Sequence, residues 1–170
     1  MEMSVSPPFR GNRAYIGMGS NLGDSLDLLR SATARLAGLG AVVAASPLYE
    51  TDPVGYEDQP AFLNAVVLLD TTLEPDDLLD ALLAIEAEFH RERTVRWGPR
   101  TLDLDLLWYE GVTRSDERLT LPHPRAHERE FVLRPLVDLD PELPLAGSTA
   151  SELLRRLPNQ GVRLAQATIT

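Results

Sequence analysis

The sequence predicts an α+β protein in which helices pack on one face of an antiparallel sheet. Several segments alternate apolar and polar residues with the two-residue period of a half-buried strand. Two longer segments repeat their apolar residues every three to four positions, which is the spacing of a helix. Along residues 14–109 the order is strand, helix, strand, strand, helix, strand, and this order indicates a ferredoxin-like βαββαβ core.

Local signals place the individual elements. The first helix is expected to run from about Asp24, a suitable N-cap, to Gly40, with one apolar stripe facing the core. The second begins at Pro75, a residue suited to the first turn of a helix, and its leucine-rich stripe also predicts a buried face. The expected strands cover residues 14–19, 41–50, 62–69 and 101–109.

The sheet and the chain ends carry further expectations. Residues 1–12 are expected to be a flexible leader, and 13–170 a single domain, because this length suffices for one full core. We expect strands 41–50 and 62–69 to be antiparallel neighbours. Strand 101–109 should be central, because one of its faces is so apolar.

A C-terminal extension should follow the core. Thr149 and Glu152 have the spacing of a capping box, which predicts a final helix ending near Leu157. Residues 161–169 have the composition of a closing strand.

The composition excludes several classes of protein. A net charge of −10 argues against general nucleic-acid binding, which requires a basic surface. No apolar run is long enough to cross a bilayer, and the N-terminus lacks the apolar centre of a signal peptide, so we expect a cytoplasmic protein. Because cysteine is absent, side-chain metal ligands would have to be His, Asp or Glu.

The candidate chemistry is concentrated in residues 91–109. Four arginines occur within ten residues, around a Trp-Gly-Pro sequence that interrupts any helix. The strand that follows alternates, with three leucines and Trp108 at one parity and Asp103 and Asp105 at the other. The two aspartates should therefore project from one face of the strand, about 6 to 7 Å apart at the backbone.

These two motifs suit a polyphosphate. Mg²⁺ takes oxygen ligands and is commonly held by one or two carboxylates plus substrate phosphates. Guanidinium groups bind phosphate oxygens in bidentate fashion. An Asp-x-Asp or an arginine run is, by itself, usually a solvated surface. Because here they adjoin and carry opposite charges, we interpret them together as one site.

Two further segments are candidates for ligand contact. The proline-containing loop 51–60 is long enough to shape a pocket. Phe62 and Asn64 share a face of the next strand, and a ring beside an amide suits a flat heterocycle, although alone they would more often be a core aromatic and a loop-closing amide. His123 lies between two prolines, so a loop presents it, and nearby arginines favour a phosphate contact.

Together these motifs resemble the 6-hydroxymethyl-7,8-dihydropterin pyrophosphokinase family. The resemblance spans about residues 14–145. Its most specific piece is Arg96-Trp97-Gly98-Pro99-Arg100-Thr101-Leu102-Asp103-Leu104-Asp105, supported by Leu121-Pro122-His123-Pro124-Arg125 and Gly19-Ser20-Asn21-Leu22-Gly23. Members of this folate-pathway family move the terminal pyrophosphate of ATP onto a pterin hydroxymethyl group and release AMP.

The resemblance implies a role for each matching residue. Asp103 and Asp105 would hold two Mg²⁺ ions that bridge the ATP phosphates, and Arg91 and Arg100 would stabilise the transferring group. ATP would be contacted by Glu86, Arg93, Trp97, Arg118, Thr120, His123 and Arg129. The pterin would be contacted by Thr51, Asp52, Val54, Phe62, Asn64 and Phe131, with the two phenylalanines on opposite sides of the ring. Residues 91–98 would close as a lid.

The expected partners follow from these roles. They are the small molecules ATP and the pterin, bound by a monomer that associates with neither nucleic acid nor membrane. Two positions depart from the family pattern. His90 stands where members usually carry Gly, which predicts a stiffer or longer second helix, and Asp52 occupies a variable position where the backbone carbonyl is the expected contact.

Two other functions are compatible with the sequence. One is a metal-dependent transferase or phosphohydrolase that acts on another nucleotide and is indifferent to pterin. The other is a ferredoxin-like binding or regulatory domain with a vestigial site, which the retained arginines and aspartates disfavour.

Overall fold

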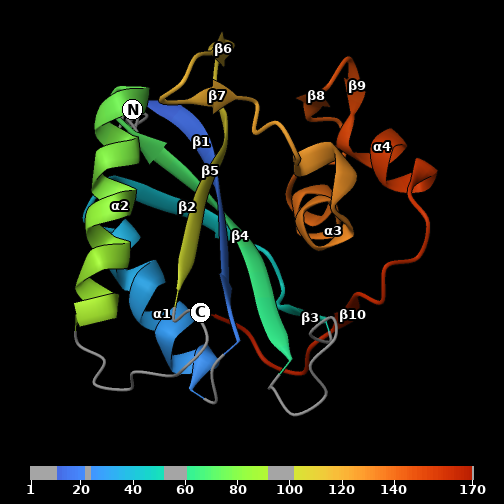
Figure 1. Ribbon diagram of the computed structural model, residues 1–170, viewed down its shortest axis with the longest axis horizontal. Coiled ribbons are helices and arrows are strands. Elements are labelled where there is room, and N and C mark those ends of the chain that lie inside the picture. Colours follow the sequence, from blue (N-terminus) through green and yellow to red (C-terminus); the bar gives the residue numbers. More distant parts are fainter. Residues whose placement is uncertain (1–10, 22–23, 52–60, 92–101, 170) are drawn as a thin grey trace, which may run out of the picture.

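The computed structural model describes residues 11–21, 24–51, 61–91 and 102–169. Within these residues an antiparallel sheet is flanked by helices (Figure 1). Its strands are β1 (Asn12–Ser20), β2 (Ala41–Ala45), β3 (Tyr49–Thr51), β4 (Phe62–Thr71), β5 (Asp103–Tyr109) and β10 (Arg163–Leu164). The helices are α1 (Ser25–Leu36), α2 (Pro75–Arg91), η1 (Ala126–Glu128), α3 (Glu130–Leu139) and α4 (Ala150–Arg156). Two short hairpins are formed by β6 (Arg114–Ser115) with β7 (Thr120–Leu121) and by β8 (Pro144–Leu145) with β9 (Ser148–Thr149).

The order of strands across the sheet is β10, β3, β4, β1, β5, and β2 also pairs with β4. The predicted strand 41–50 is therefore two strands, and both are antiparallel neighbours of β4, as expected. Pro47 lies between them and has no N–H to continue a ladder. The Ser46 hydroxyl instead accepts a hydrogen bond from the Val66 N–H at 2.9 Å.

The prediction that the aspartate strand is central was wrong. Strand β5 pairs with β1 and forms the end of the sheet order. Its apolar face is buried by a helix instead of by strands on both sides, because Leu104 and Leu106 belong to the same core cluster as Leu82 and Phe89 of α2. Burial of one face does not require a central position.

The strict alternation predicted for this strand also breaks near its end. Tyr15 and Ile16 of β1 oppose Trp108 and Leu106, so Leu107 has no partner in the β1 ladder and forms a bulge. Trp108 therefore does not share the face of the leucines. It packs edge-on against Tyr15 with ring centroids 5.6 Å apart and donates a hydrogen bond to the Pro144 carbonyl at 3.0 Å.

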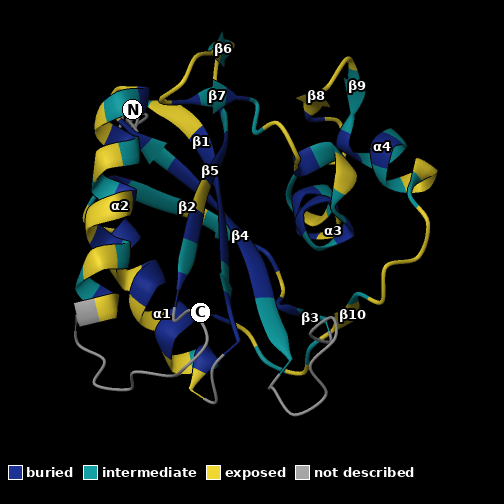
Figure 2. Cartoon of the chain, viewed as in Figure 1, coloured by how far each residue is buried: buried dark blue, intermediate teal, exposed yellow. Residues whose placement is uncertain are grey.

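Helices cover both faces of the sheet, whereas the sequence predicted helices on one face and a C-terminal helix and strand without a stated position. The first core lies under α1 and α2, and their predicted apolar stripes are buried there (Figure 2). The second core lies between the other face and α3, α4, where Leu107 packs with Leu133, Leu136 and Leu153. Helix α3 was not predicted from the sequence. Pro135 lies inside this helix, although it removes an N–H from its ladder.

The two ends of the chain agree partly with expectation. The predicted final helix is α4, and the Thr149 hydroxyl accepts the Glu152 N–H at 3.3 Å, as a capping residue does. Of the predicted strand 161–169 only Arg163–Leu164 is a strand, and Ile169 is buried in the first core. Strand β1 begins at Asn12, inside the predicted leader, whose first ten residues lie outside the described part. No helix among the described residues has both the length and the apolarity needed to cross a membrane.

Candidate active site

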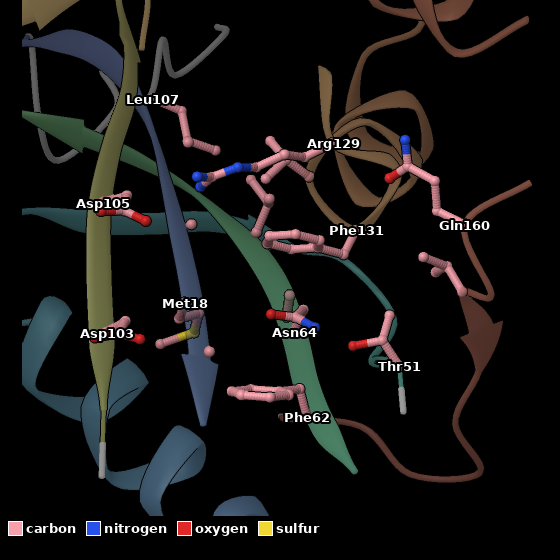
Figure 3. A pocket seen from close by; sticks show the side chains of 16 residues that line it. Met18, Thr51, Phe62, Asn64, Asp103, Asp105, Leu107, Arg129, Phe131 and Gln160 are labelled. Atoms are coloured by element: carbon pink, nitrogen blue, oxygen red, sulfur yellow. The ribbon is translucent and has the colours of Figure 1, made fainter. Parts of the chain in front are cut away.

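A cavity of about 640 Å³ lies on the sheet face that carries α3 (Figure 3). Strands β1, β3, β4 and β5, the start of α3 and the chain before β10 contribute to its walls. The lining residues are Gly17, Met18, Gly19, Thr51, Phe62, Asn64, Ala65, Val66, Asp103, Asp105, Leu107, Arg129, Phe131, Val132, Gln160 and Val162.

The predicted aspartate pair forms one end of this cavity. Asp103 and Asp105 lie on the same face of β5, as the sequence predicted. Their direct partners across the ladder are Gly19 and Gly17, respectively. Because the glycines have no side chains, the space in front of the carboxylates stays open.

The other end of the cavity combines rings and an amide. Figure 3 shows Asn64 between the rings of Phe62 and Phe131, with Thr51 beside them. Asn64 is buried and pairs with Gly19, which in turn pairs with Asp103. The aspartate and the amide are thus two strands apart, about 10 Å at the backbone. The four described residues predicted to contact a pterin share one cavity with the aspartates.

A positive charge faces the aspartates from the opposite wall. The Arg129 side chain extends from the start of α3 toward the strand that carries Asp105 (Figure 3). Its guanidinium also lies over the Phe131 ring, 5.7 Å from the centroid. A cation held over an aromatic face is partly preorganised for an anion, because the ring restricts the side chain.

His123 lies close to the same charges. Its backbone N–H donates to the Leu107 carbonyl at 2.8 Å, and its Nδ1 accepts the Arg125 N–H at 3.1 Å. Burial lowers the pKa of its imidazole, the nearby Asp105 carboxylate opposes this shift, and the Arg129 and Arg125 charges add to it. A neutral imidazole is therefore favoured near pH 7. As predicted, a loop and not a helix carries it.

Glu86 lies behind the aspartate strand. Its carboxylate accepts a hydrogen bond from the Leu104 N–H at 2.6 Å, and Leu104 lies between the two aspartates in the sequence. Burial raises the pKa of the Glu86 carboxyl, the Leu104 hydrogen bond lowers it, and the charges of Asp103 and Asp105 raise it further. The structure thus joins Glu86 to the backbone of β5, and Glu86 does not line the cavity.

Three other residues predicted to contact ATP, His123, Thr120 and Arg118, also lie outside the cavity wall. Thr120 is in the β6–β7 hairpin, where it pairs with Ser115. The Arg118 guanidinium forms ion pairs with Asp76 at 3.1 Å and with Asp80, both on α2. Arg118 is therefore held by acids on the helix in this conformation.

Part of the predicted site lies outside the described residues. These positions are Asp52, Val54, Arg93, Trp97 and Arg100, together with the side chain of Arg91, which ends α2. The Ser-Asn-Leu-Gly turn after β1 is also only partly described.

Four residues of the cavity wall were not predicted as site residues from the sequence: Gly17, Gly19, Gln160 and Val162. Gly17 and Gly19 had a usable signal, because glycines at alternate positions of a strand often mark a close approach of a ligand or another chain segment. Gln160 and Val162 had none. They reach the cavity through the path of the C-terminal segment, which no local pattern predicts.

The carboxylates of Asp103 and Asp105 fit a Mg²⁺ site whose other ligands are waters and substrate oxygens. Within residues 11–21, 24–51, 61–91 and 102–169, no group of three or more His, Asp or Glu side chains is arranged to hold a metal. A pair of carboxylates is nevertheless the protein share that Mg²⁺ commonly uses, since waters and substrate phosphates supply its other oxygen ligands.

A cavity with two carboxylates and an arginine at one end, and two rings with an amide at the other, is suited to an enzyme that joins a charged group to a flat ligand. The sequence matches the family described as 7,8-dihydro-6-hydroxymethylpterin-pyrophosphokinase (HPPK) over residues 15–141, and the chain belongs to this family. It is thus a pyrophosphokinase, a transferase that uses ATP.

Two bacterial relatives carry the name 2-amino-4-hydroxy-6-hydroxymethyldihydropteridine pyrophosphokinase. The protein of Methylorubrum extorquens is 49% identical over 152 residues, which cover 88% of this chain and 96% of the relative. The protein of Bacillus subtilis is 51% identical over 130 residues, covering 75% of this chain and 78% of the relative.

Larger proteins also match. The folic acid synthesis protein fol1 of Schizosaccharomyces pombe is 44% identical, and the match covers 89% of this chain but 21% of that protein. A crystal structure of a Plasmodium falciparum HPPK-DHPS triple mutant aligns with a TM-score of 0.70 at 17% identity, over 89% of this chain and 44% of that one. This structural likeness supports the mixed helix and antiparallel-sheet fold. The chain thus spans less than half the length of these larger proteins.

Proposed function

We propose that this protein transfers the pyrophosphoryl group of ATP to the hydroxymethyl group of 6-hydroxymethyl-7,8-dihydropterin and releases AMP, as a step of folate biosynthesis. One observation carries the proposal. A single cavity holds the carboxylates of Asp103 and Asp105 and also the ring-and-amide group of Phe62, Asn64 and Phe131. The names of the relatives supply the chemical identity of the two ligands.

The pterin occupies the end with the rings. Phe62 and Phe131 lie on either side of Asn64, so a flat heterocycle placed between the rings brings its edge to the amide. An amide offers both a donor and an acceptor, which matches the alternating edge of a pterin. Thr51 contributes a hydroxyl, and Asp52 and Val54 complete the pocket as the family resemblance implies.

The triphosphate occupies the end with the carboxylates. Asp103 and Asp105 would hold two Mg²⁺ ions, which would supply positive charge to neutralise much of the phosphate charge. The Arg129 side chain, which points toward Asp105 from the opposite wall (Figure 3), would contact the phosphates. Arg91 and Arg100 stabilise the transferring group, and Glu86, Arg93, Trp97, Arg118, Thr120 and His123 complete the ATP site. Arg118 must then exchange one of its ion pairs with α2 for a phosphate.

The reaction needs little covalent participation by the protein. The hydroxymethyl oxygen forms a bond to the β-phosphorus while the bond from that phosphorus to the α-phosphate oxygen breaks, and AMP leaves. The hydroxyl proton passes to solvent or to a phosphate oxygen. The protein contributes positioning and electrostatic stabilisation, which explains a site of arginines and carboxylates without a nucleophile.

Mixing the protein with ATP, Mg²⁺ and 6-hydroxymethyl-7,8-dihydropterin tests the proposal, with AMP as the readout. We expect AMP above a pterin-free control. We expect Asp105→Asn to lower kcat by about 10³-fold, because it removes one of the two carboxylates. Asp77→Asn, which changes an exposed acid on α2, is the matched control and should be silent. ATP turnover indifferent to pterin, or full activity of Asp105→Asn, would contradict the assignment.

The remaining proposals concern the fold and the setting of the protein. We assign the core to the ferredoxin-like class, supported by the strand order β5, β1, β4 and then β2 and β3 with two helices on one face. We further propose that residues 13–170 act as a single domain and that the protein is a cytoplasmic monomer that binds these two small molecules.

A further inference from the structure

We propose that the C-terminal segment 159–162 is a wall of the substrate cavity, held in place by Glu130 as a positioning residue, and that this wall sets the affinity for the flat substrate. The proposal rests on the proposed function for the identity of that substrate. The wall and its attachment are properties of the fold.

The segment lies at the recognition end of the cavity. Gln160 and Val162 line the cavity with Thr51 and Phe131. Figure 3 shows Gln160 on the opposite side of the cavity from Asp103 and Asp105. The wall is therefore remote from the carboxylates and close to the aromatic pocket.

Gln160 and Glu130 are joined by reciprocal hydrogen bonds, which we call the clasp. The Gln160 N–H donates to Glu130 Oε1 at 2.7 Å, and the Glu130 N–H donates to Gln160 Oε1 at 2.9 Å. The Gln160 amide nitrogen donates to the Glu128 carbonyl at 3.1 Å. Both ends of the Gln160 amide are thus engaged by protein, so its aliphatic stem is held in one orientation beside the cavity.

Glu130 is placed to make the clasp strong. It is only 3% exposed, and its second oxygen accepts from Arg134 Nε at 2.7 Å. Hydrogen bonds to an ionised carboxylate are stronger than neutral ones, and an acid in the first turn of a helix is favoured by the helix dipole. Glu130 also stands between Arg129 and Phe131, which both line the cavity. One side chain therefore links the C-terminal wall to the start of α3.

The residues that follow the wall, 163–165, are bound to the segment 48–50. This attachment limits how far the wall can move without the clasp. Arg163 Nε pairs with Glu50 at 2.9 Å, and the Ala165 N–H donates to the Leu48 carbonyl at 2.9 Å. Loss of the clasp should therefore loosen residues 159–162 locally while the sheet persists. An enzyme with a loosened recognition wall binds its substrate more weakly but transfers the group at the same rate once the substrate is bound.

The test uses the full-length chain and the variants Glu130→Ala, Gln160→Ala and their combination. We expect Glu130→Ala to raise the KM for the pterin about tenfold, because it removes the charge-assisted hydrogen bond from the Gln160 N–H. Gln160→Ala keeps that N–H and removes only the bonds of the amide side chain, so it should raise this KM less, about threefold. In both variants kcat and the KM for ATP should stay within about twofold of wild type. The double variant should have a higher KM for the pterin than either single variant, because each substitution removes a different half of the clasp. Glu130→Gln keeps an acceptor and should be intermediate.

Glu128→Ala is the matched control. It removes an exposed carboxylate two residues away, while the backbone carbonyl that Gln160 uses remains. This variant should keep the wild-type KM for the pterin. If Glu130→Ala fails to fold, Gln160→Ala tests the side-chain half of the clasp, since it leaves the buried carboxylate paired with Arg134 and with the backbone N–H of position 160.

Hydrogen exchange at the Gln160 amide gives a readout that does not depend on activity. The amide should be protected in the wild type, exchange faster in Glu130→Ala and be unchanged in Glu128→Ala. An unprotected Gln160 amide in the wild type would overturn the clasp. Faster exchange with an unaltered KM for the pterin, or a fall in kcat alone, would overturn its role in affinity. A wild-type protein that forms no AMP with pterin would overturn the proposed function, whereas the exchange result would still decide the clasp.

Discussion

The absence of a side chain at Gly19 is predicted to control how the cavity binds the pterin. A Cβ built at Gly19 would lie 2.8 Å from Asn64 Oδ1, a separation that folded proteins do not tolerate. In Gly19→Ala the Asn64 amide must therefore turn away, at a cost of about 0.5 to 1.5 kcal/mol for an off-rotamer side chain. The free energy of unfolding should fall by a similar amount or less, since Ala also restricts the unfolded chain.

The effect on binding should be larger than the effect on stability. A displaced amide loses its hydrogen bonds to the pterin edge, at about 1 kcal/mol each. Two such bonds correspond to a KM for the pterin raised about 30-fold. The kcat should fall as well, because the new methyl group enters the space in front of Asp103, the ladder partner of Gly19. Steady-state kinetics with AMP detection measures both constants. Gly17→Ala, on the same strand face, would contact Leu107 methyl groups at 3.2 Å instead, and its effect on this KM should be smaller.

A double-mutant cycle decides whether the amide is the cause. In an Asn64→Ala background, Gly19→Ala should raise the KM for the pterin no further, because the group that it displaces is gone. Equal effects of Gly19→Ala in both backgrounds would refute the reasoning and would point to direct contact between the new methyl group and the substrate.

Two further predictions concern stability. Because burial raises the pKa of the Glu86 carboxyl, the folded protein holds this proton more tightly than the unfolded chain, so Glu86 ionisation costs stability as pH rises above 4.5. The free energy of unfolding of the wild type relative to Glu86→Gln should therefore fall with rising pH in urea titrations, and a difference constant with pH would contradict this. Thr149→Ala should lower the free energy of unfolding by about 1 kcal/mol by removing the α4 cap, whereas Ser151→Ala should have little effect.

The local patterns of the sequence were sufficient for the helices with clear stripes and for the aspartate pair. In α2 the buried residues Leu78, Leu82, Ile85 and Phe89 repeat at helical spacing, so periodicity alone was informative. The shared face of Asp103 and Asp105 follows from strand geometry in the same way.

The features that the sequence did not predict depend on contacts between distant segments. The edge position of β5 was missed because α2, not a second neighbouring strand, buries its leucines. The bulge at Leu107 is a matter of register with β1, which alternation cannot show. Helix α3 was missed although its buried residues Val132, Leu133 and Leu136 are helically spaced, and the Pro135 between them is the feature that argues against a helix.

The position of β5 at the sheet edge has a consequence for how copies of the protein behave at high concentration. An edge strand offers backbone groups to which a strand of another chain can add, and this is a common route to aggregation. Here the Leu104 N–H is already bound to Glu86 and the Leu107 carbonyl accepts the His123 N–H. Two hydrogen bonds would have to break before a foreign strand could pair along this edge, so the residues beside the aspartates also protect the folded chain from self-association.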